Sequence, residues 1–245
     1  MNLQKYMISC VYLLLMAVTI PAHTQAQGNS ALSNLWKGVG GKSTWSNTSY
    51  ILFTVDGNMS KYLQDGRTFI INRKTGQARL EGRTASNENL VLLFNFKSGK
   101  LDRLSSNGKE VVDKAAFTQE HFGKVLAQLE KDASLLFLPT LLEKPSAKVG
   151  KLEHKIVNAE KLDVFSLSLG GDKFEGTILF NPESGLIKQL VDQEGSVYYV
   201  NGYKDIGGGL TLPTTFKNLS DSKKSTTFSV VASFEELEET KFTKL

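Results

Sequence analysis

Apolar and polar residues alternate in short segments over most of the chain. Ile51, Phe53 and Val55 share one face of a stretch that ends in the turn pair Asp56-Gly57, which is typical of a β-strand followed by a turn. Similar segments recur between residues 67 and 110, with turn signals at intervals of about 8 to 12 residues. Glycine and asparagine interrupt them before they are long enough for helices. The spacing therefore predicts an antiparallel meander.

The period of the apolar residues changes in the middle of the chain. Phe117, His121, Val125 and Leu129 recur every four residues, which places them on one face of a helix. The apolar stretch SLLFLPTLL follows, and the proline within it predicts a short helix that is broken or kinked. The strand pattern then returns and holds almost to the C-terminus.

This order of patterns predicts a mainly β fold of the α+β class. We expect a curved antiparallel sheet or half-barrel, with a helical insert at about residues 115–143 that covers one face. A chain of this length is sufficient for one sizeable domain, which we place at residues 27–245.

Residues 1–26 have the pattern of a secretory signal peptide. Lys5 precedes an apolar, uncharged run at residues 7–20, and small residues lead to a cleavage position after Ala26. The run is short for a membrane-spanning helix, which needs about 20 apolar residues. We therefore expect export to the periplasm or beyond, and a retained membrane anchor is the alternative.

The amino-acid composition argues against several classes of function. Cys10 is the only cysteine and lies in the signal segment, so the mature chain is expected to have no disulfide and no thiol chemistry. Basic and acidic residues, 29 and 25 in number, are mixed without a long basic run, which gives nucleic-acid binding little support. His121 and His154 have no second histidine or cysteine at ligand spacing, so we predict no metal site and no cofactor.

No catalytic motif is present in the sequence. The Gly-x-Ser-x-Gly turn that exposes a serine nucleophile does not occur, and we expect a protein that is not an enzyme and has no catalytic residues. Carboxylates that are distant in sequence can still meet in space, so a hydrolase with unrecognised carboxylates is an alternative.

An excess of apolar residues on the strands indicates where a ligand would bind. The segment NLVLLFNF is apolar on both of its faces, whereas a sheet with one solvated face alternates cleanly. We expect the helical insert on one side, and more sheet or a cavity on the other. The predicted ligand-binding residues, with the last two on the insert as a lid, are Ile51, Phe53, Val55, Leu90, Leu92, Phe94, Phe96, Phe137 and Leu138. The alternative is that all of them pack together as a filled core.

Three local patterns resemble the LolA-like superfamily of lipoprotein-sorting proteins, most closely its secreted members in Gram-negative envelopes. The first is Gly40-Gly41 followed by Trp45, and the second is the turn NPESG before Leu186. The third is GLTLP at residues 209–213, after a run of glycines that can adopt positive φ. In this third pattern we expect the two leucines to re-enter the sheet and the proline to lie at an edge or bulge.

The resemblance implies a function as well as a fold. It implies an exported, non-enzymatic binding protein that holds a lipid, an acyl chain or another apolar ligand in the concavity of its sheet. An acyl chain of a lipoprotein is the partner it implies, and we expect a monomer with peripheral contact to the envelope. An envelope protein-interaction module with a filled core and no small ligand is the alternative.

Overall fold

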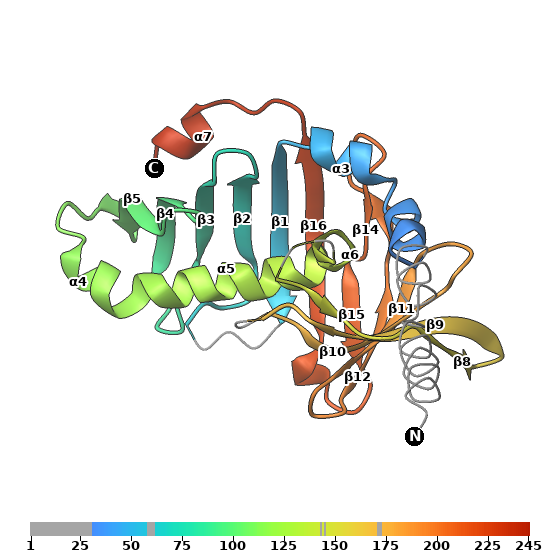
Figure 1. Cartoon of the computed structure of the whole chain (residues 1–245). Coiled ribbons are helices and arrows are strands. Elements are labelled where there is room, and N and C mark those ends of the chain that lie inside the picture. Colours follow the sequence, from blue (N-terminus) through green and yellow to red (C-terminus); the bar gives the residue numbers. More distant parts are fainter. Residues whose placement is uncertain (1–30, 58–61, 143, 145, 171–172) are drawn as a thin grey trace, which may run out of the picture.

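One large antiparallel sheet dominates the computed structural model (Figure 1), which describes residues 31–57, 62–142, 144, 146–170 and 173–245. In this part of the chain the sheet has 14 strands in the order β6-β5-β4-β3-β2-β1-β16-β15-β12-β11-β10-β9-β7, and β8 also pairs with β9. The sheet is curved and unclosed, so the predicted fold class is confirmed. The predicted signal peptide at residues 1–26 lies outside the described residues.

The first half of the chain forms a meander in which each strand lies beside its predecessor. Along β1 the burial alternates as the sequence predicts, and Ile51, Phe53 and Val55 are fully buried. The strands of this half are β1 (Tyr50–Gly57), β2 (Arg67–Asn72), β3 (Gln77–Arg83), β4 (Asn89–Asn95), β5 (Lys100–Ser106) and β6 (Lys109–Glu110).

Four consecutive helical segments follow the meander: α4 (Ala115–Phe117), the π-helical turn η1 (Thr118–Phe122), α5 (Gly123–Leu136) and α6 (Leu138–Leu141). Helix α5 lies across one face of the sheet (Figure 1), which we call the inner face. The chain breaks at Phe137, between α5 and α6. Pro139 lies in the first turn of α6, where a missing N–H costs nothing. The predicted break is present, and it precedes the proline.

The second half of the chain returns to the sheet and joins the first half through its last strand. β16 pairs with β1 along its whole length, from Tyr50↔Phe234 to Gly57↔Thr226. The strands of this half are β7 (Lys148–Val149), β8 (Glu153–Val157), β9 (Glu160–Ser168), β10 (Glu175–Phe180), β11 (Ile187–Asp192), β12 (Val197–Asn201), β15 (Thr215–Asn218) and β16 (Thr226–Phe234), and the short 3-10 turn η2 (Ser222–Lys224) precedes β16.

The GLTLP segment does not re-enter the large sheet, so that expectation was wrong. Thr211–Leu212 forms β14, which pairs with β13 (Lys204–Asp205) in a separate two-stranded sheet. Pro213 follows directly, and the chain joins the large sheet only at β15. Leu210 and Leu212 are nevertheless fully buried, because the small hairpin folds onto the main core.

The three patterns that resemble lipoprotein-sorting proteins meet at one joint of the structure. Residues 31–38 are helical, and α3 (Lys42–Asn47) follows after the two glycines. The backbone of Gly40 lies so close to Gly209 that a Cβ would collide with its carbonyl oxygen, and Gly185 is equally close to the carbonyl oxygen of Asn34. The amide of Thr211 also donates to the carbonyl of Val39 at 3.1 Å. The glycines of the three patterns therefore allow segments of backbone to pack closely against each other.

Because of these close contacts, we expect glycine-to-alanine substitutions to destabilise the protein more at this joint than elsewhere. Gly185 and Gly195 both have positive φ, 72° and 80°, but only Gly185 faces a neighbouring backbone. We expect Gly195→Ala to cost about 1 kcal/mol of unfolding free energy from backbone strain alone. Gly185→Ala should cost about 2–3 kcal/mol, because the helix must also move away. Urea unfolding of both variants measures the difference, and equal losses would contradict the close contact.

The outer face of the first half is covered by the C-terminal segment, where the sequence predicts more sheet or a cavity. Arg79 donates to the carbonyl of Lys244 at 2.6 Å, and Arg103 donates to that of Thr243 at 2.7 Å. These contacts hold α7 (Thr240–Thr243) against β3 and β4. Leu93, the register partner of both arginines, is only 1% exposed beneath this segment. This packing accounts for the second apolar face of β4.

Candidate functional site

The residues predicted to bind a ligand are brought together on the inner face. All of them except Phe96 are buried in one hydrophobic core, and Phe96 packs against it half-buried. The ring of Phe53 lies 5.4 Å from Phe69, 5.9 Å from Phe137 and 6.1 Å from Phe228, centroid to centroid. Their role in binding stays a prediction, and the core around Phe53 is closely packed with aromatic rings.

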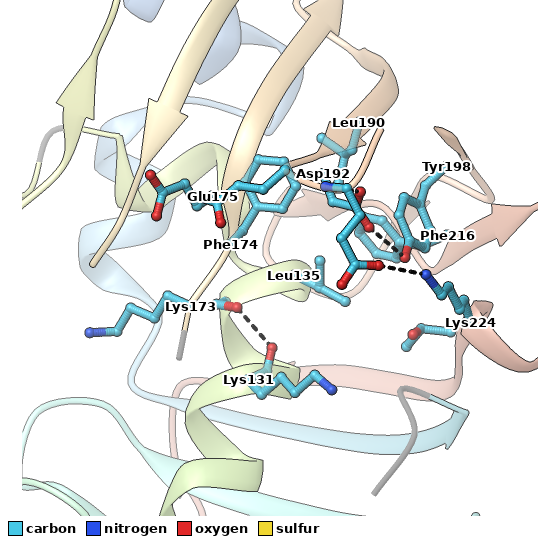
Figure 2. A pocket seen from close by; sticks show the side chains of 14 residues that line it. Lys131, Leu135, Lys173, Phe174, Glu175, Leu190, Asp192, Tyr198, Phe216 and Lys224 are labelled. Atoms are coloured by element: carbon cyan, nitrogen blue, oxygen red, sulfur yellow. Dashed lines mark hydrogen bonds and ion pairs between the residues drawn. The ribbon is translucent and has the colours of Figure 1, made fainter. Parts of the chain in front are cut away.

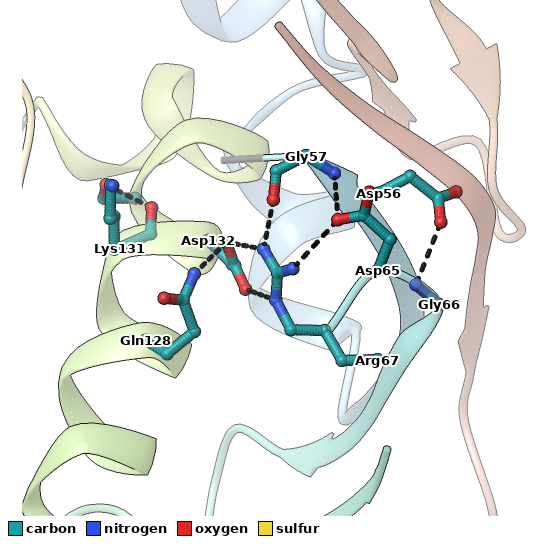
Figure 3. A network of polar contacts seen from close by, with 9 residues as sticks. Asp56, Gly57, Asp65, Gly66, Arg67, Gln128, Lys131 and Asp132 are labelled. Atoms are coloured by element: carbon teal, nitrogen blue, oxygen red, sulfur yellow. Dashed lines mark hydrogen bonds and ion pairs between the residues drawn. The ribbon is translucent and has the colours of Figure 1, made fainter. Parts of the chain in front are cut away.

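A buried ion pair fixes α5 above this half of the sheet (Figure 3). Arg67 of β2 donates to both carboxylate oxygens of Asp132 on α5, at 2.7 and 2.8 Å. Both side chains have no exposed surface. Arg67 also donates to the carbonyl of Gly57 at 2.9 Å, and Gln128 donates to Asp132 at 2.9 Å. A bidentate pair of this kind sets the position and the rotation of the helix.

The second half of the inner face is hollowed. A cavity of about 430 Å³ lies between the C-terminal half of α5 and strands β10, β11, β12, β15 and β16 (Figure 2). We call it the hollow. Its lining residues are Lys131, Ser134, Leu135, Lys173, Phe174, Glu175, Leu190, Asp192, Gln193, Glu194, Tyr198, Phe216, Lys224 and Thr226.

The floor of the hollow is apolar. Leu190 and Phe216 are buried members of the main core, and Leu135, Phe174 and Tyr198 pack against that core while half-buried. The floor is thus continuous with the core under α5. The fully buried residues hold its shape, and the half-buried ones present apolar surface to the hollow.

Asp192 and Tyr198 form a fixed polar group in the wall. Asp192 Oδ1 accepts hydrogen bonds from the amides of Glu194 and Ser196, at 3.0 and 2.8 Å. Its Oδ2 accepts from the Tyr198 hydroxyl at 3.1 Å. Burial raises the pKa of Tyr198, and the Asp192 charge adds to the effect, so the hydroxyl stays a donor at neutral pH. The hydrogen bonds of the Asp192 carboxylate therefore stabilise the turn between β11 and β12.

Two lysines at the rim are paired with glutamates. Lys224 donates to Glu194 at 2.9 Å and to the Ser196 hydroxyl at 3.2 Å, and the hydrogen bond to Glu194 raises the pKa of Lys224. Lys173 lies 2.6 Å from Glu130 of α5. A second cavity of about 460 Å³ shares Glu175, Asp192 and Gln193 with the hollow, and its other lining residues include Lys148 and Val149 of β7.

Within the described ranges, no three histidine, cysteine, aspartate or glutamate side chains are arranged to hold a metal ion. None of the described helices has the length and apolar character to cross a membrane.

Comparisons with known proteins give matches among solved structures only. No family model and no curated protein matches the chain. A domain from Vibrio parahaemolyticus, described as belonging to an outer membrane lipoprotein-sorting protein, matches with a TM-score of 0.33 and 10% identity, over 83% of this chain and 94% of that domain. MucB matches with a TM-score of 0.27 and 11% identity, over 89% of this chain and 62% of MucB. MucB in complex with MucA(peri) matches with a TM-score of 0.28 and 10% identity, over 89% of this chain and 58% of that one.

The chain thus spans about three-fifths of the length of the MucB structures it matches. The predicted resemblance to lipoprotein-sorting proteins is confirmed as a resemblance. At identities of 10–11% it concerns the fold, and the properties of the site follow from the residues of this chain.

Proposed function

We propose that the protein is an exported, non-enzymatic binding protein that holds an apolar ligand, such as an acyl chain, in the hollow. The observation that carries this proposal is the apolar floor of the hollow, on the same sheet face that α5 covers elsewhere. A volume of about 430 Å³ falls within the range of small-molecule sites. An interaction module without a small ligand is the competing function.

The half-buried leucines of α5 supply a matched test. Leu135 lines the hollow, whereas Leu126 lies nine residues earlier on the same helix, outside it. We expect Leu135→Glu to abolish binding of an apolar ligand, because it places a charge on the floor. Leu126→Glu should leave binding unchanged, since both leucines are only partly buried and both variants should fold.

The measurement is displacement of a fluorescent apolar probe, together with native mass spectrometry of the purified full chain. Acyl species that co-purify with the unmodified protein and are lost from Leu135→Glu alone would support the proposal. A ligand-free protein that binds no apolar probe would instead favour the interaction module. Circular dichroism of both variants checks that the fold is retained.

A further inference from the structure

At the rim of the hollow, the lysine side chains are more deeply buried than the glutamate side chains. Lys131, Lys173 and Lys224 are half-buried, whereas Glu175 and Glu194 are exposed. The contrast is clearest in the rim pair, where the side chain of Lys224 is 31% exposed and that of Glu194 is 76% exposed. The side chain of Glu194 therefore extends further into solvent than that of Lys224.

The one carboxylate that lies deeper, Asp192, is already engaged. Two backbone amides and the Tyr198 hydroxyl donate to it. Its charge is thus shared among fixed donors of the protein. The positive charge of Lys224, by contrast, is balanced by Glu194, whose exposed carboxylate is free to rotate into solvent.

An exposed ion pair stabilises a protein little, because water and salt screen it. The contact between Lys224 and Glu194 can therefore be exchanged at low cost for a contact with a ligand. A group that lies on the apolar floor thus has half-buried ammonium groups beside it, while the carboxylates of Glu175 and Glu194 stay exposed.

We infer that the ligand of the hollow is an anionic single-chain amphiphile, whose carboxylate or phosphate replaces Glu194 on the Lys224 ammonium. Its chain lies on the floor beside Leu135 and Phe174. A volume of about 430 Å³ lies near the lower end of ligand pockets, which suits one chain better than two. This inference rests on the proposed function and adds the sign of the head group.

Probes with the same chain and different head groups test the inference. Dodecanoate, dodecyl phosphate, dodecanol and dodecylammonium are each titrated, below micellar concentrations, against the full chain and its variants. We expect both anions to bind roughly tenfold more tightly than dodecanol, as for one charge-assisted hydrogen bond. The tighter of the two anions identifies whether the natural head group is a carboxylate or a phosphate.

Two substitutions with opposite expected signs separate recognition from structure. Lys224→Gln should remove the preference for anions, and Glu194→Gln should strengthen it by removing the internal competitor. Lys223→Gln is the matched control, because Lys223 lies on the same turn but is exposed and does not line the hollow. If Lys224 were important only for structure, both Lys224→Gln and Glu194→Gln would weaken binding of the probes.

The outcomes distinguish this inference from the proposed function. Equal binding of dodecanoate and dodecanol, unaffected by Lys224→Gln, would overturn the head-group assignment and leave the apolar site intact. Tighter binding of dodecylammonium would overturn it as well, since the preferred sign would be reversed. Failure of all four probes would overturn both the inference and the proposed function.

Discussion

Asp132→Ala is expected to lower the free energy of unfolding by about 3–5 kcal/mol, the usual cost of breaking a buried ion pair. The substitution leaves the Arg67 guanidinium without its bidentate acceptor, in a place where neither side chain has exposed surface. Equilibrium unfolding in urea, followed by circular dichroism, measures the loss.

Two comparisons show whether the cost arises from the unpaired charge. The double variant Arg67→Met, Asp132→Leu should recover much of the stability, because well-packed apolar residues can replace a buried ion pair. Glu110→Ala, which breaks the exposed bidentate pair with Arg103, should change stability little. If the double variant were as unstable as Asp132→Ala, shape rather than charge would account for the loss.

Phe53→Ala and Phe94→Ala are expected to cost about 3–5 kcal/mol each in the protein without ligand. Phe53 has no exposed surface and Phe94 is 1% exposed. Phe53 contacts three aromatic rings, and Phe94 lies edge-on to Phe122 at 5.6 Å. Alanine at either position removes this packing and leaves a void that the surrounding core cannot fill completely.

The same variants test the predicted ligand-binding residues of the first half. A phenylalanine that lines an open cavity loses little packing, so a loss well below the core range at both positions would support ligand contact there. Phe234→Ala is the control, since Phe234 is 37% exposed on β16 and should cost much less. Losses in the full core range would exclude an open cavity at these two phenylalanines.

The sequence predicts the strands of this protein well because period and turn signals are local. Ile51, Phe53 and Val55 alternate with less buried neighbours, as β1 requires. Asp56-Gly57 was expected to turn the chain, but both residues still pair with β16 as the last two residues of β1. The helix was equally visible, since Val125 and Leu129 recur at its period and are buried. The short helix α3 was not foreseen, because KSTWSN shows no helical period of apolar residues.

The site was harder to foresee because it depends on where α5 comes to lie. Arg67 and Asp132 are 65 residues apart, and no sequence pattern links them. Leu190 and Phe216 show the same strand pattern as Leu92, yet they form the floor of the hollow while Leu92 lies in the packed core. Which half of the sheet the helix covers is a property of tertiary packing.

The pairing of β1 with β16 has a consequence for the order in which the protein folds. Each half of the sheet contains neighbouring strands that are also neighbours in sequence, so these hairpins can form early and independently. The seam between the halves joins Tyr50 to Phe234, and it requires closure of a loop that comprises most of the chain. Formation of this seam should therefore limit the rate of folding. A chain that still lacks β16 would expose the edges of β1 and β15, where chaperones or other chains can bind.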